Sequence, residues 1–203
     1  KEFRYIDFAL PGQIGFSLLS LATFGVAFGM ITLRETLVLK RIFATTVRPI
    51  QFVLALVLSR SFQAVLQAAA IIVIGVLAFD FTLQDGWMSG LSMLVLSFLG
   101  ILTFVGFGIL ISNLAKDENT LPIALNIFNL PQFLLSGVFF PIDDMPATVR
   151  LIGNNLPLSY LNIALRKVSI EGLGLFEVWP YILGMLGWAI FSYLIAAKTF
   201  KTE

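Results

Sequence analysis

The sequence predicts an all-α integral membrane protein, a polytopic helical bundle with five membrane spans in this chain. The first observation is composition, because 58% of the 203 residues are hydrophobic and only 12% are charged. Soluble proteins carry about twice that share of charge, and so few charged side chains cannot cover a water-facing surface. The second is the long windows free of Asp, Glu, Lys and Arg. The third is the lack of alternating apolar and polar residues, which favours helices over a transmembrane barrel.

The charge-poor windows locate the spans, since a hydrocarbon core of about 30 Å needs roughly 20 apolar helical residues. The predicted spans are residues 8–33, 50–79, 86–115, 120–142 and 178–197. In the second span the charge-free part begins only after Arg60, whose long side chain we expect to reach back to the membrane interface. Residues 1–203 thus form one transmembrane domain.

Basic residues in the connections set the orientation, because cytoplasmic loops are enriched in Lys and Arg. One side of the predicted bundle carries eight basic residues: Arg34, Lys40, Arg41, Arg48, Arg60, Lys116, Lys198 and Lys201. The other side carries five: Lys1, Arg4, Arg150, Arg166 and Lys167. The richer side is predicted to be cytoplasmic, with the C-terminus inside and Lys1 outside. A chain that begins outside without a signal peptide predicts one earlier span, or six in all.

The connection at residues 34–48 is too polar to span a membrane and too apolar for a free loop. Helical spacing places basic side chains on one side and leaves Leu37, Val38 and Ile42 available for burial. The segment is either an interfacial helix on anionic lipid or a docking element for a cytoplasmic partner. The polar turn at residues 45–49 favours docking, and its Pro49 suits the first turn of the next helix.

The outer connection at residues 143–177 is long for a link between helices. It holds two short runs that can form helices, at residues 147–152 and 159–168, with Pro157 between them. Their apolar side chains would not be left in water: Val149, Leu151, Ile152, Leu161, Ile163 and Leu165. We therefore expect short re-entrant helices that dip into the outer leaflet and are buried against protein.

Composition also excludes or disfavours several kinds of site. The chain has no Cys and no His, which excludes disulfides, thiol nucleophiles, Ser–His catalysis and most zinc sites. Its net charge of +1 is not that of a nucleic-acid-binding protein. The acidic pairs at residues 117–118 and 143–144 fall in connections, where such pairs are ordinarily solvated. We predict no catalytic residue, cofactor or metal on this chain. Charge-free windows disfavour a proton-coupled carrier but leave a channel or facilitator open.

Uncharged polar and aromatic side chains mark a candidate substrate path in the first and fourth spans. The path residues are Phe24, Phe28, Asn126, Asn129 and Phe133. An aromatic wall facing polar amides suits a large amphipathic substrate. The alternative is ordinary helix packing, in which Asn amides bond to neighbouring helices and Phe rings fill gaps.

Five segments in chain order resemble the permease subunits of type-2 ABC exporters. They are residues 10–20 (Leu-Pro-Gly-Gln-Ile-Gly-Phe-Ser-Leu-Leu-Ser), 34–46 (Arg-Glu, then Leu-Lys-Arg-Ile-Phe-Ala-Thr-Thr), 58–60 (Leu-Ser-Arg), 135–141 (Leu-Ser-Gly-Val-Phe-Phe-Pro) and 156–166 (Leu-Pro-Leu-Ser-Tyr, then Ala-Leu-Arg). Each motif is only moderately specific, but together they cover essentially the whole chain. Thr46 departs from the pattern, because relatives often have Pro there.

The resemblance implies six spans with both ends cytoplasmic, re-entrant helices at residues 143–170, and a coupling helix that seats in a separate ATPase subunit. The coupling residues would be Arg34, Glu35, Leu37, Lys40, Arg41 and Ile42. ATP and Mg²⁺ would bind to the partner ATPase, since no lysine here follows a glycine and a Walker-type phosphate loop is absent. Two permease copies, or this chain and a relative, would frame a path for a drug- or lipid-like substrate. Transport would follow alternating access across the bacterial cytoplasmic membrane. Export of a polysaccharide or glycolipid is the alternative within the family.

Overall fold

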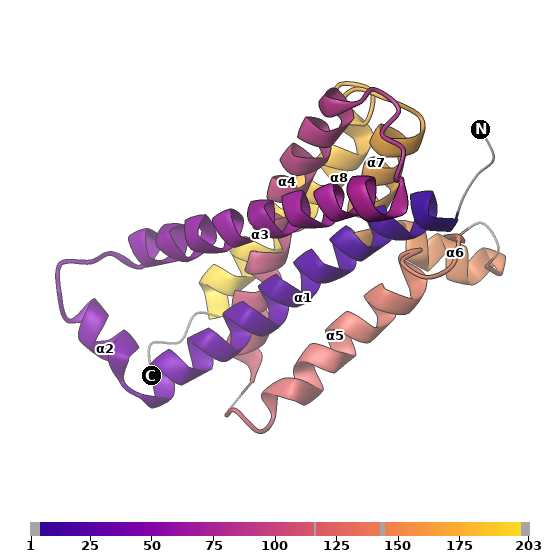
Figure 1. Cartoon of the computed structure of the whole chain (residues 1–203). Helices are drawn as coiled ribbons and strands as arrows, with labels where there is room; N and C mark the ends of the chain where they lie inside the picture. The colour runs from indigo at the N-terminus through magenta and orange to yellow at the C-terminus, as the bar shows by residue number, and fades with distance from the viewer. Residues whose placement is uncertain (1–4, 116, 143–144, 200–203) are drawn as a thin grey trace.

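The computed structural model describes residues 5–115, 117–142 and 145–199, and Figure 1 shows them as a bundle of helices. The helices are α1 (Tyr5–Glu35), α2 (Val38–Phe43), α3 (Pro49–Phe79), α4 (Trp87–Leu114), α5 (Leu121–Leu135), α6 (Ala147–Asn154), α7 (Pro157–Ile170) and α8 (Trp179–Thr199). The predicted all-α class is confirmed. Several residues used in the charge analysis lie outside the described residues: Lys1, Arg4, Lys116, Asp143, Asp144 and Lys201.

Four of these helices are long and apolar enough to cross a membrane: α1, α3, α4 and α8. They coincide with four of the five predicted spans to within a few residues at each end. At 31 residues each, α1 and α3 extend about 46 Å, which exceeds a hydrocarbon core of about 30 Å. Their end turns can therefore reach the headgroup region.

The remaining predicted span is shorter than the sequence indicates. The prediction is a helix across residues 120–142, but α5 ends at Leu135 after 15 residues. Gly137 adopts φ 70°, a left-handed conformation that commonly follows the end of a helix. At about 1.5 Å per residue α5 covers about 22 Å, so on its own it does not cross the whole hydrocarbon core.

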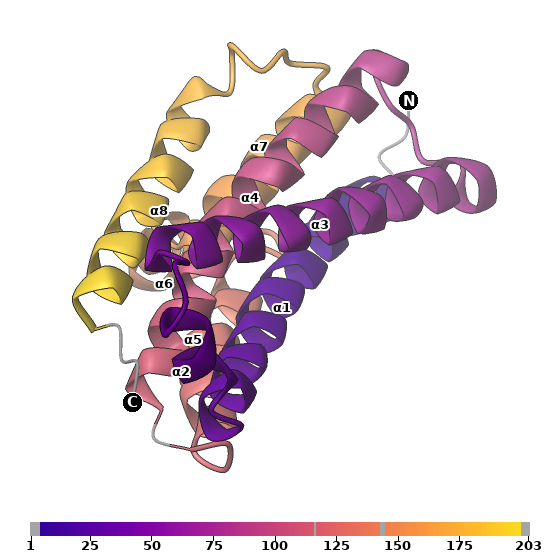
Figure 2. The same cartoon turned by 90° about the vertical axis from the view of Figure 1, so that its left-hand side faces the viewer.

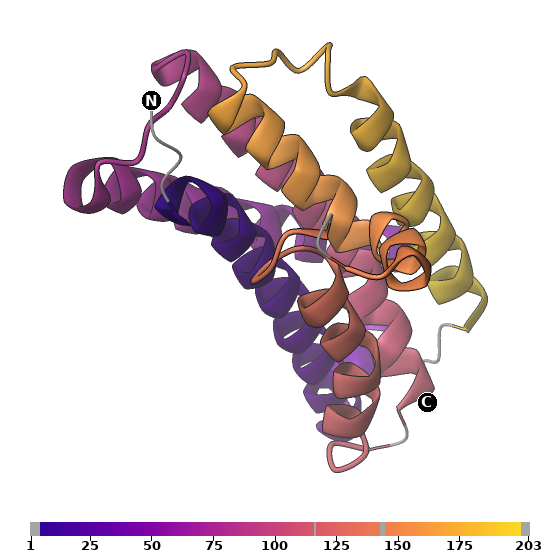
Figure 3. The ribbon, with the colours of Figure 1, turned by 90° about the vertical axis from the view of Figure 1, so that its right-hand side faces the viewer.

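The central helix is α4, which contacts α1, α3, α7 and α8. Figure 2 shows α3 laid across α1 and α4, and Figure 3 shows α7 and α8 beside α4. Glycines let the neighbours approach closely. A Cβ at Gly108 would lie 2.8 Å from the Ala22 carbonyl oxygen, and one at Gly100 would lie 2.7 Å from Leu161 Cδ2. Small residues on α4 therefore set the close packing of α1 and α7, as is usual for helices in membranes.

The connections gather at two ends of the bundle. In Figure 1, α2, the α4–α5 turn and the end of α8 lie together, and the α3–α4 turn, α6 and the α7–α8 connection lie toward the other end. Hydrogen bonds join the first group, since the Glu118 N–H donates to Glu35 Oε1 at 3.3 Å and Asn113 Nδ2 donates to Thr199 Oγ1 at 3.3 Å. This grouping agrees with the connectivity predicted from the sequence. Which end is cytoplasmic stays a prediction.

The outer connection contains the two short helices that the sequence predicts. Of these, α7 lies among α1, α4, α5 and α8, and its Leu158, Leu161 and Leu165 side chains are fully buried. The apolar side chains of α6 were expected to be buried against protein as well, but Leu151 is 70% exposed and Ile152 is 57% exposed. With only eight residues, α6 turns one side toward α5 and α7 and leaves the other uncovered.

Single cysteines should report the orientation, because the chain contains none. Thr45 is exposed between α2 and α3, whereas Gln84 and Asn154 are exposed near the opposite end. In intact cells, an impermeant maleimide should label Gln84→Cys and Asn154→Cys. It should leave Thr45→Cys unlabelled until the cells are opened, because the basic end is expected to be cytoplasmic. Labelling of position 45 alone in intact cells would reverse the orientation.

Candidate functional site

The segment between α1 and α3 begins with a break in the helix. After α1 ends at Glu35, Leu37 adopts φ 56° and ψ 13°, a left-handed conformation that is uncommon for a residue other than glycine. The next residue starts α2, and α3 follows with Pro49 in its first turn, as predicted. The predicted coupling segment is thus a separate short helix between two turns.

The two sides of α2 differ in burial. Its buried and half-buried residues are Val38, Leu39 and Ile42, and its exposed residues are Lys40 and Arg41. Leu37 is 51% exposed, so it presents apolar surface next to the exposed bases. Leu39 is fully buried although helical spacing singled out only Leu37, Val38 and Ile42 for burial, because the break at Leu37 changes which side of α2 faces the bundle. Glu35, another predicted coupling residue, is exposed.

The inner polar cluster, Arg34, Asn113 and Thr199, joins the ends of α1, α4 and α8. Arg34 Nη1 donates to the Ser112 carbonyl at 2.8 Å, and Nη2 donates to Asn113 Oδ1. Asn113 Nδ2 donates in turn to the Ala196 carbonyl at 3.0 Å and to Thr199 Oγ1 at 3.3 Å. Arg34, predicted as a coupling residue, is therefore engaged inside this chain just before α2. The cluster therefore links the end of α1, just before α2, to the ends of α4 and α8.

The fourth predicted span packs along α1 through two specific contacts. Asn129 Nδ2 donates to Thr23 Oγ1 at 3.0 Å, and both side chains are fully buried. One turn farther along α5, the centroid of the Phe133 ring lies 4.4 Å from that of Phe16. Asn129 and Phe133 do share a face of α5, but this face is packed against α1 in the single chain.

The other predicted path residues lie in different surroundings. Phe24 and Phe28 are half-buried and pack with the first turns of α5. They therefore lie nearer the α2 end than Asn129 and Phe133 do. Asn126 is exposed. The structure brings four of the five residues to the contact between α1 and α5 and leaves Asn126 outside it. That a substrate passes along this contact stays a prediction.

The outer polar cluster, Gln132, Ser136 and Asn162, lies where the end of α5 meets α7. Gln132 Oε1 accepts the Leu158 N–H at 3.1 Å, in the first turn of α7. Asn162 Nδ2 donates to the Ser136 carbonyl at 3.1 Å, and all three side chains are buried. The Leu158 N–H in the first turn of α7 has no acceptor within its own helix, and Gln132 of α5 supplies one. This bond ties the two helices together.

Arg166 connects the same region to the start of α1. Its Nε donates to the Phe8 carbonyl at 3.3 Å, and its Nη2 donates to the Gly137 carbonyl. The guanidinium carbon lies 3.7 Å from the centroid of the Phe8 ring. Two carbonyl acceptors and an aromatic face together replace part of the hydration that this cation loses on burial.

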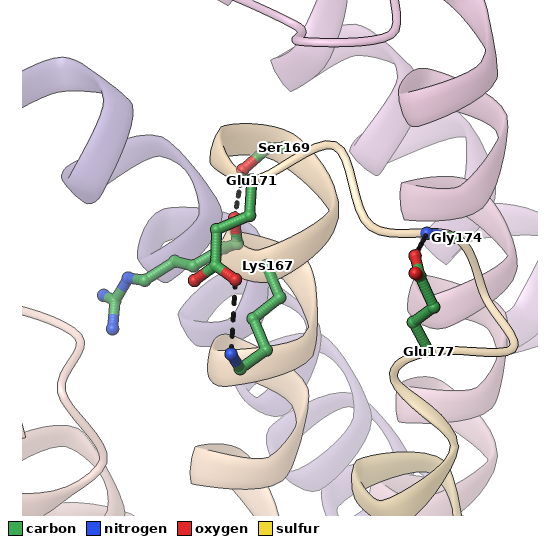
Figure 4. Close-up of polar contacts among 6 residues, drawn as sticks. Lys167, Ser169, Glu171, Gly174 and Glu177 are labelled. Atoms are coloured by element: carbon green, nitrogen blue, oxygen red, sulfur yellow. Dashed lines mark hydrogen bonds and ion pairs between the residues drawn. The ribbon is translucent and has the colours of Figure 1, made fainter.

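Local contacts hold the end of α7 and the connection to α8 (Figure 4). Lys167 Nζ lies 3.3 Å from Glu171 Oε2, one helical turn farther on. In the connection, Glu177 Oε2 accepts the Gly174 N–H at 2.7 Å. Gly172 has φ 69° and allows the chain to turn away from α7. Exposed ion pairs contribute little to stability, so the shape of this connection depends mainly on the turns.

The sequence model of the ABC-2 type transporter family matches residues 2–170, which include α1 to α7. ABC transporter G family member 20 of Dictyostelium discoideum is 26% identical over 198 residues, 95% of this chain and 26% of that protein. The "Probable multidrug ABC transporter permease YbhS" of Escherichia coli strain K12 is 35% identical over 85 residues, 40% of this chain and 22% of that protein. The corresponding YbhR protein is 30% identical over 78 residues, 38% of this chain and 21% of that protein.

The chain spans only 21% to 26% of the length of these relatives. No solved structure matches it.

Replacing Asn113 should weaken the inner polar cluster. Asn113→Leu removes the acceptor of Arg34 Nη2 and the donor to α8, and leaving a buried polar group unpaired costs about 1–3 kcal/mol. The thermal midpoint of the purified chain in detergent should therefore fall. Asn119→Leu is the matched control, because Asn119 is exposed in the nearby α4–α5 turn. Equal midpoints for the two variants would contradict the stabilising role of the cluster.

Proposed function

This chain belongs to the ABC-2 type transporter family, and we propose that it is the membrane permease of an ATP-driven exporter for amphipathic or hydrophobic, drug- or lipid-like substrates. Two relatives in Escherichia coli are named probable multidrug ABC transporter permeases, which supports this substrate class. The membrane would be the bacterial cytoplasmic membrane. A second permease copy and two ATPase subunits would complete the transporter.

The observation that carries the proposal is the surface of α2 and its preceding turn. Exposed Leu37 lies beside exposed Lys40 and Arg41, so one apolar side chain is flanked by two cations. Apolar contacts surrounded by charge are typical of protein interfaces, in which the apolar centre contributes affinity and the charged rim contributes specificity. We assign the ATPase subunit to this surface.

The inner polar cluster supports a route for the motion. The ATPase subunits would close on ATP, move α2, and so move the end of α1 at Arg34. Arg34 bonds to the end of α4, and Asn113 extends the connection to α8. Alternating access would follow as a change in the packing of these spans.

The substrate route in this proposal follows the contact between α1 and α5. Phe24, Phe28, Asn129 and Phe133 border this contact, and exposed Asn126 would face a second permease copy across the central path. Opening of the route would require α5 to separate in part from α1. The Thr23–Asn129 hydrogen bond and the Phe16–Phe133 ring contact would then be the interactions that change.

Coupling through α2 can be tested at Leu37. Aspartate tolerates the left-handed conformation at this position, so Leu37→Asp should fold and insert normally. The new carboxylate would lie beside Lys40 and Arg41, so the ATPase interface would have to bury an ion pair where it now buries an apolar side chain, and desolvating that pair opposes docking. Permease isolated with its ATPase should therefore lose substrate-stimulated ATP hydrolysis, and transport should stop.

Two further variants make the Leu37 test specific. Leu37→Asn also tolerates the left-handed conformation but adds no charge, so coupling should fall less than in Leu37→Asp. Leu151→Asp adds the same charge at an exposed leucine of α6, far from α2, and should leave ATP hydrolysis coupled. Normal transport by Leu37→Asp would favour a lipid-surface role for α2.

The route can be tested by comparing the two partners of one hydrogen bond. Asn129→Leu and Thr23→Val each remove the Asn129–Thr23 bond, which is typically worth only about 0.6 kcal/mol in a membrane protein. If Asn129 borders the route, Asn129→Leu should shift the profile of exported compounds toward more apolar ones, and Thr23→Val should not. Identical profiles at equal protein level would leave Asn129 with a packing role alone.

A further inference from the structure

Arg60 is a cation in a predicted membrane-spanning helix, and no acidic residue in the described part of the chain pairs with it. Nη1 donates to Gln63 Oε1 at 2.9 Å, and Nη2 donates to the Gly25 carbonyl of α1 at 3.0 Å. Its Nε is buried and makes no hydrogen bond in the described part of the chain, and no described carboxylate pairs with the guanidinium. The side chain was expected to reach back to the membrane interface. Instead its guanidinium lies against α1.

The groove that receives Arg60 depends on a glycine. A Cβ at Gly25 would lie 3.2 Å from Arg60 Nη1 and 3.4 Å from Arg60 Cζ, so a larger residue would crowd the guanidinium. The same two helices meet again at their other ends, where a Cβ at Gly75 of α3 would run into the side chain of Leu10. The residue numbers of each pair, 25 with 60 and 10 with 75, have the same sum of 85, as two antiparallel helices require. We call the contact between α1 and α3 from one pair to the other the α1/α3 seam.

Helical spacing extends a set of polar side chains along the seam between these contacts, and we call this set the polar edge. They are Gln13, Ser17 and Ser20 on α1 and Gln63 and Gln67 on α3, all exposed or half-buried. The spacing of each set, 13, 17, 20 and 60, 63, 67, is that of one helical face. Polar groups at membrane depth are costly when they face hydrocarbon, so this edge is suited to a ligand with polar atoms.

Beyond the polar edge the seam widens into an apolar pocket of about 300 Å³. Its walls include Ile6, Leu10 and Gln13 of α1 and Ile71, Ile74 and Phe79 of α3. Ile71 follows Arg60 by eleven residues, or about 16 Å along the helix. With α3 centred on a hydrocarbon core of about 30 Å, Ile71 lies about 24 Å from the inner boundary, so an acyl chain that reaches the pocket passes the middle of the bilayer.

We propose that the α1/α3 seam binds one anionic phospholipid of the inner leaflet. The phosphate binds Arg60 and the Gln63 amide, and an acyl chain follows the seam toward the pocket at Ile71 and Ile74. A guanidinium has five N–H donors, of which two are used within the protein, and its planar shape suits phosphate oxygens. A net anion is favoured over a zwitterion, because no described carboxylate at Arg60 would pair with a second cation. Binding involves this chain alone and does not depend on the export function.

The depth of Arg60 fits a lipid headgroup drawn slightly inward. Centring the roughly 46 Å of α3 on a core of about 30 Å leaves about 8 Å of helix in each headgroup region. Arg60 lies about 16 Å from the start of α3, hence about 8 Å inside the boundary. Because the guanidinium is held against α1 at Gly25, the phosphate would have to be drawn inward by about this distance to reach it.

The test places a reporter in the pocket. Ile74→Cys, the sole cysteine, is labelled with bimane and the protein is reconstituted in phosphatidylcholine nanodiscs. Phosphatidylglycerol with a nitroxide near the end of one acyl chain should quench the bimane at a several-fold lower concentration than phosphatidylcholine with the same nitroxide. Arg60→Gln should abolish this difference. Arg48→Gln, the same change at the exposed start of α3, should retain it.

Arg60→Lys is the control for misfolding of Arg60→Gln, because lysine keeps the positive charge and lacks only the planar guanidinium. Its preference for phosphatidylglycerol should lie between those of the unchanged protein and Arg60→Gln. Equal quenching by the two lipids in the unchanged protein would overturn the proposal. So would a full preference in folded Arg60→Gln. Loss of quenching on adding equimolar dodecyl phosphate would assign the seam to a single-chain amphiphile and overturn the phospholipid assignment.

Discussion

Water is absent from the core of a bilayer, so every polar group at that depth needs a partner within the protein or its ligands, and this constraint organises the bundle. Buried hydroxyls bond back to their own helices, as Ser97 does to the Met93 carbonyl and Thr103 to the Leu99 carbonyl. Most buried amides and guanidiniums cannot do so and gather near the ends of helices, in the inner and outer polar clusters. The middle of α4 contacts its neighbours mainly through small and apolar residues, and Thr103 adds a hydrogen bond to the Met185 carbonyl of α8 at 3.2 Å.

The two polar clusters hold different sets of helices. The inner polar cluster ties α1 to α4 and α8, and the outer polar cluster ties α5 to α7. Fewer directional bonds join helices near their middles, such as Asn129 to Thr23 and Thr103 to the Met185 carbonyl. A helix that keeps its partners at one end would therefore break only a few polar contacts when it tilts. Apolar surfaces can slide by small steps without leaving a polar group unpaired. Such a bundle suits the proposed alternating access.

Composition and charge spacing predicted the helical class and four long spans, because burial in a bilayer demands long apolar windows. Features that depend on backbone conformation at one residue were not predictable. The left-handed conformation of Leu37 changes which side of α2 is buried, and Gly137 ends α5 seven residues before the predicted limit at residue 142. Asn129 was singled out as a polar group at membrane depth, and the structure shows its side chain buried against α1. Its partner Thr23 lies 106 positions away in sequence, so only the fold reveals the pair.

The helix α1 is common to all three proposed sites. Its end adjoins α2, one side packs on α5 along the proposed route, and another side forms the α1/α3 seam at Gly25. A rigid helix cannot change its contact with one neighbour without changing its angle to the others. A lipid bound at Arg60 would fill the seam and therefore favour one angle between α1 and α3. Any movement that α2 imposes on α1 would act against that bound lipid. Lipid binding and ATPase-driven movement would therefore be coupled through the position of α1. The free energy by which the lipid favours one position of α1 equals the free energy by which that position favours lipid binding.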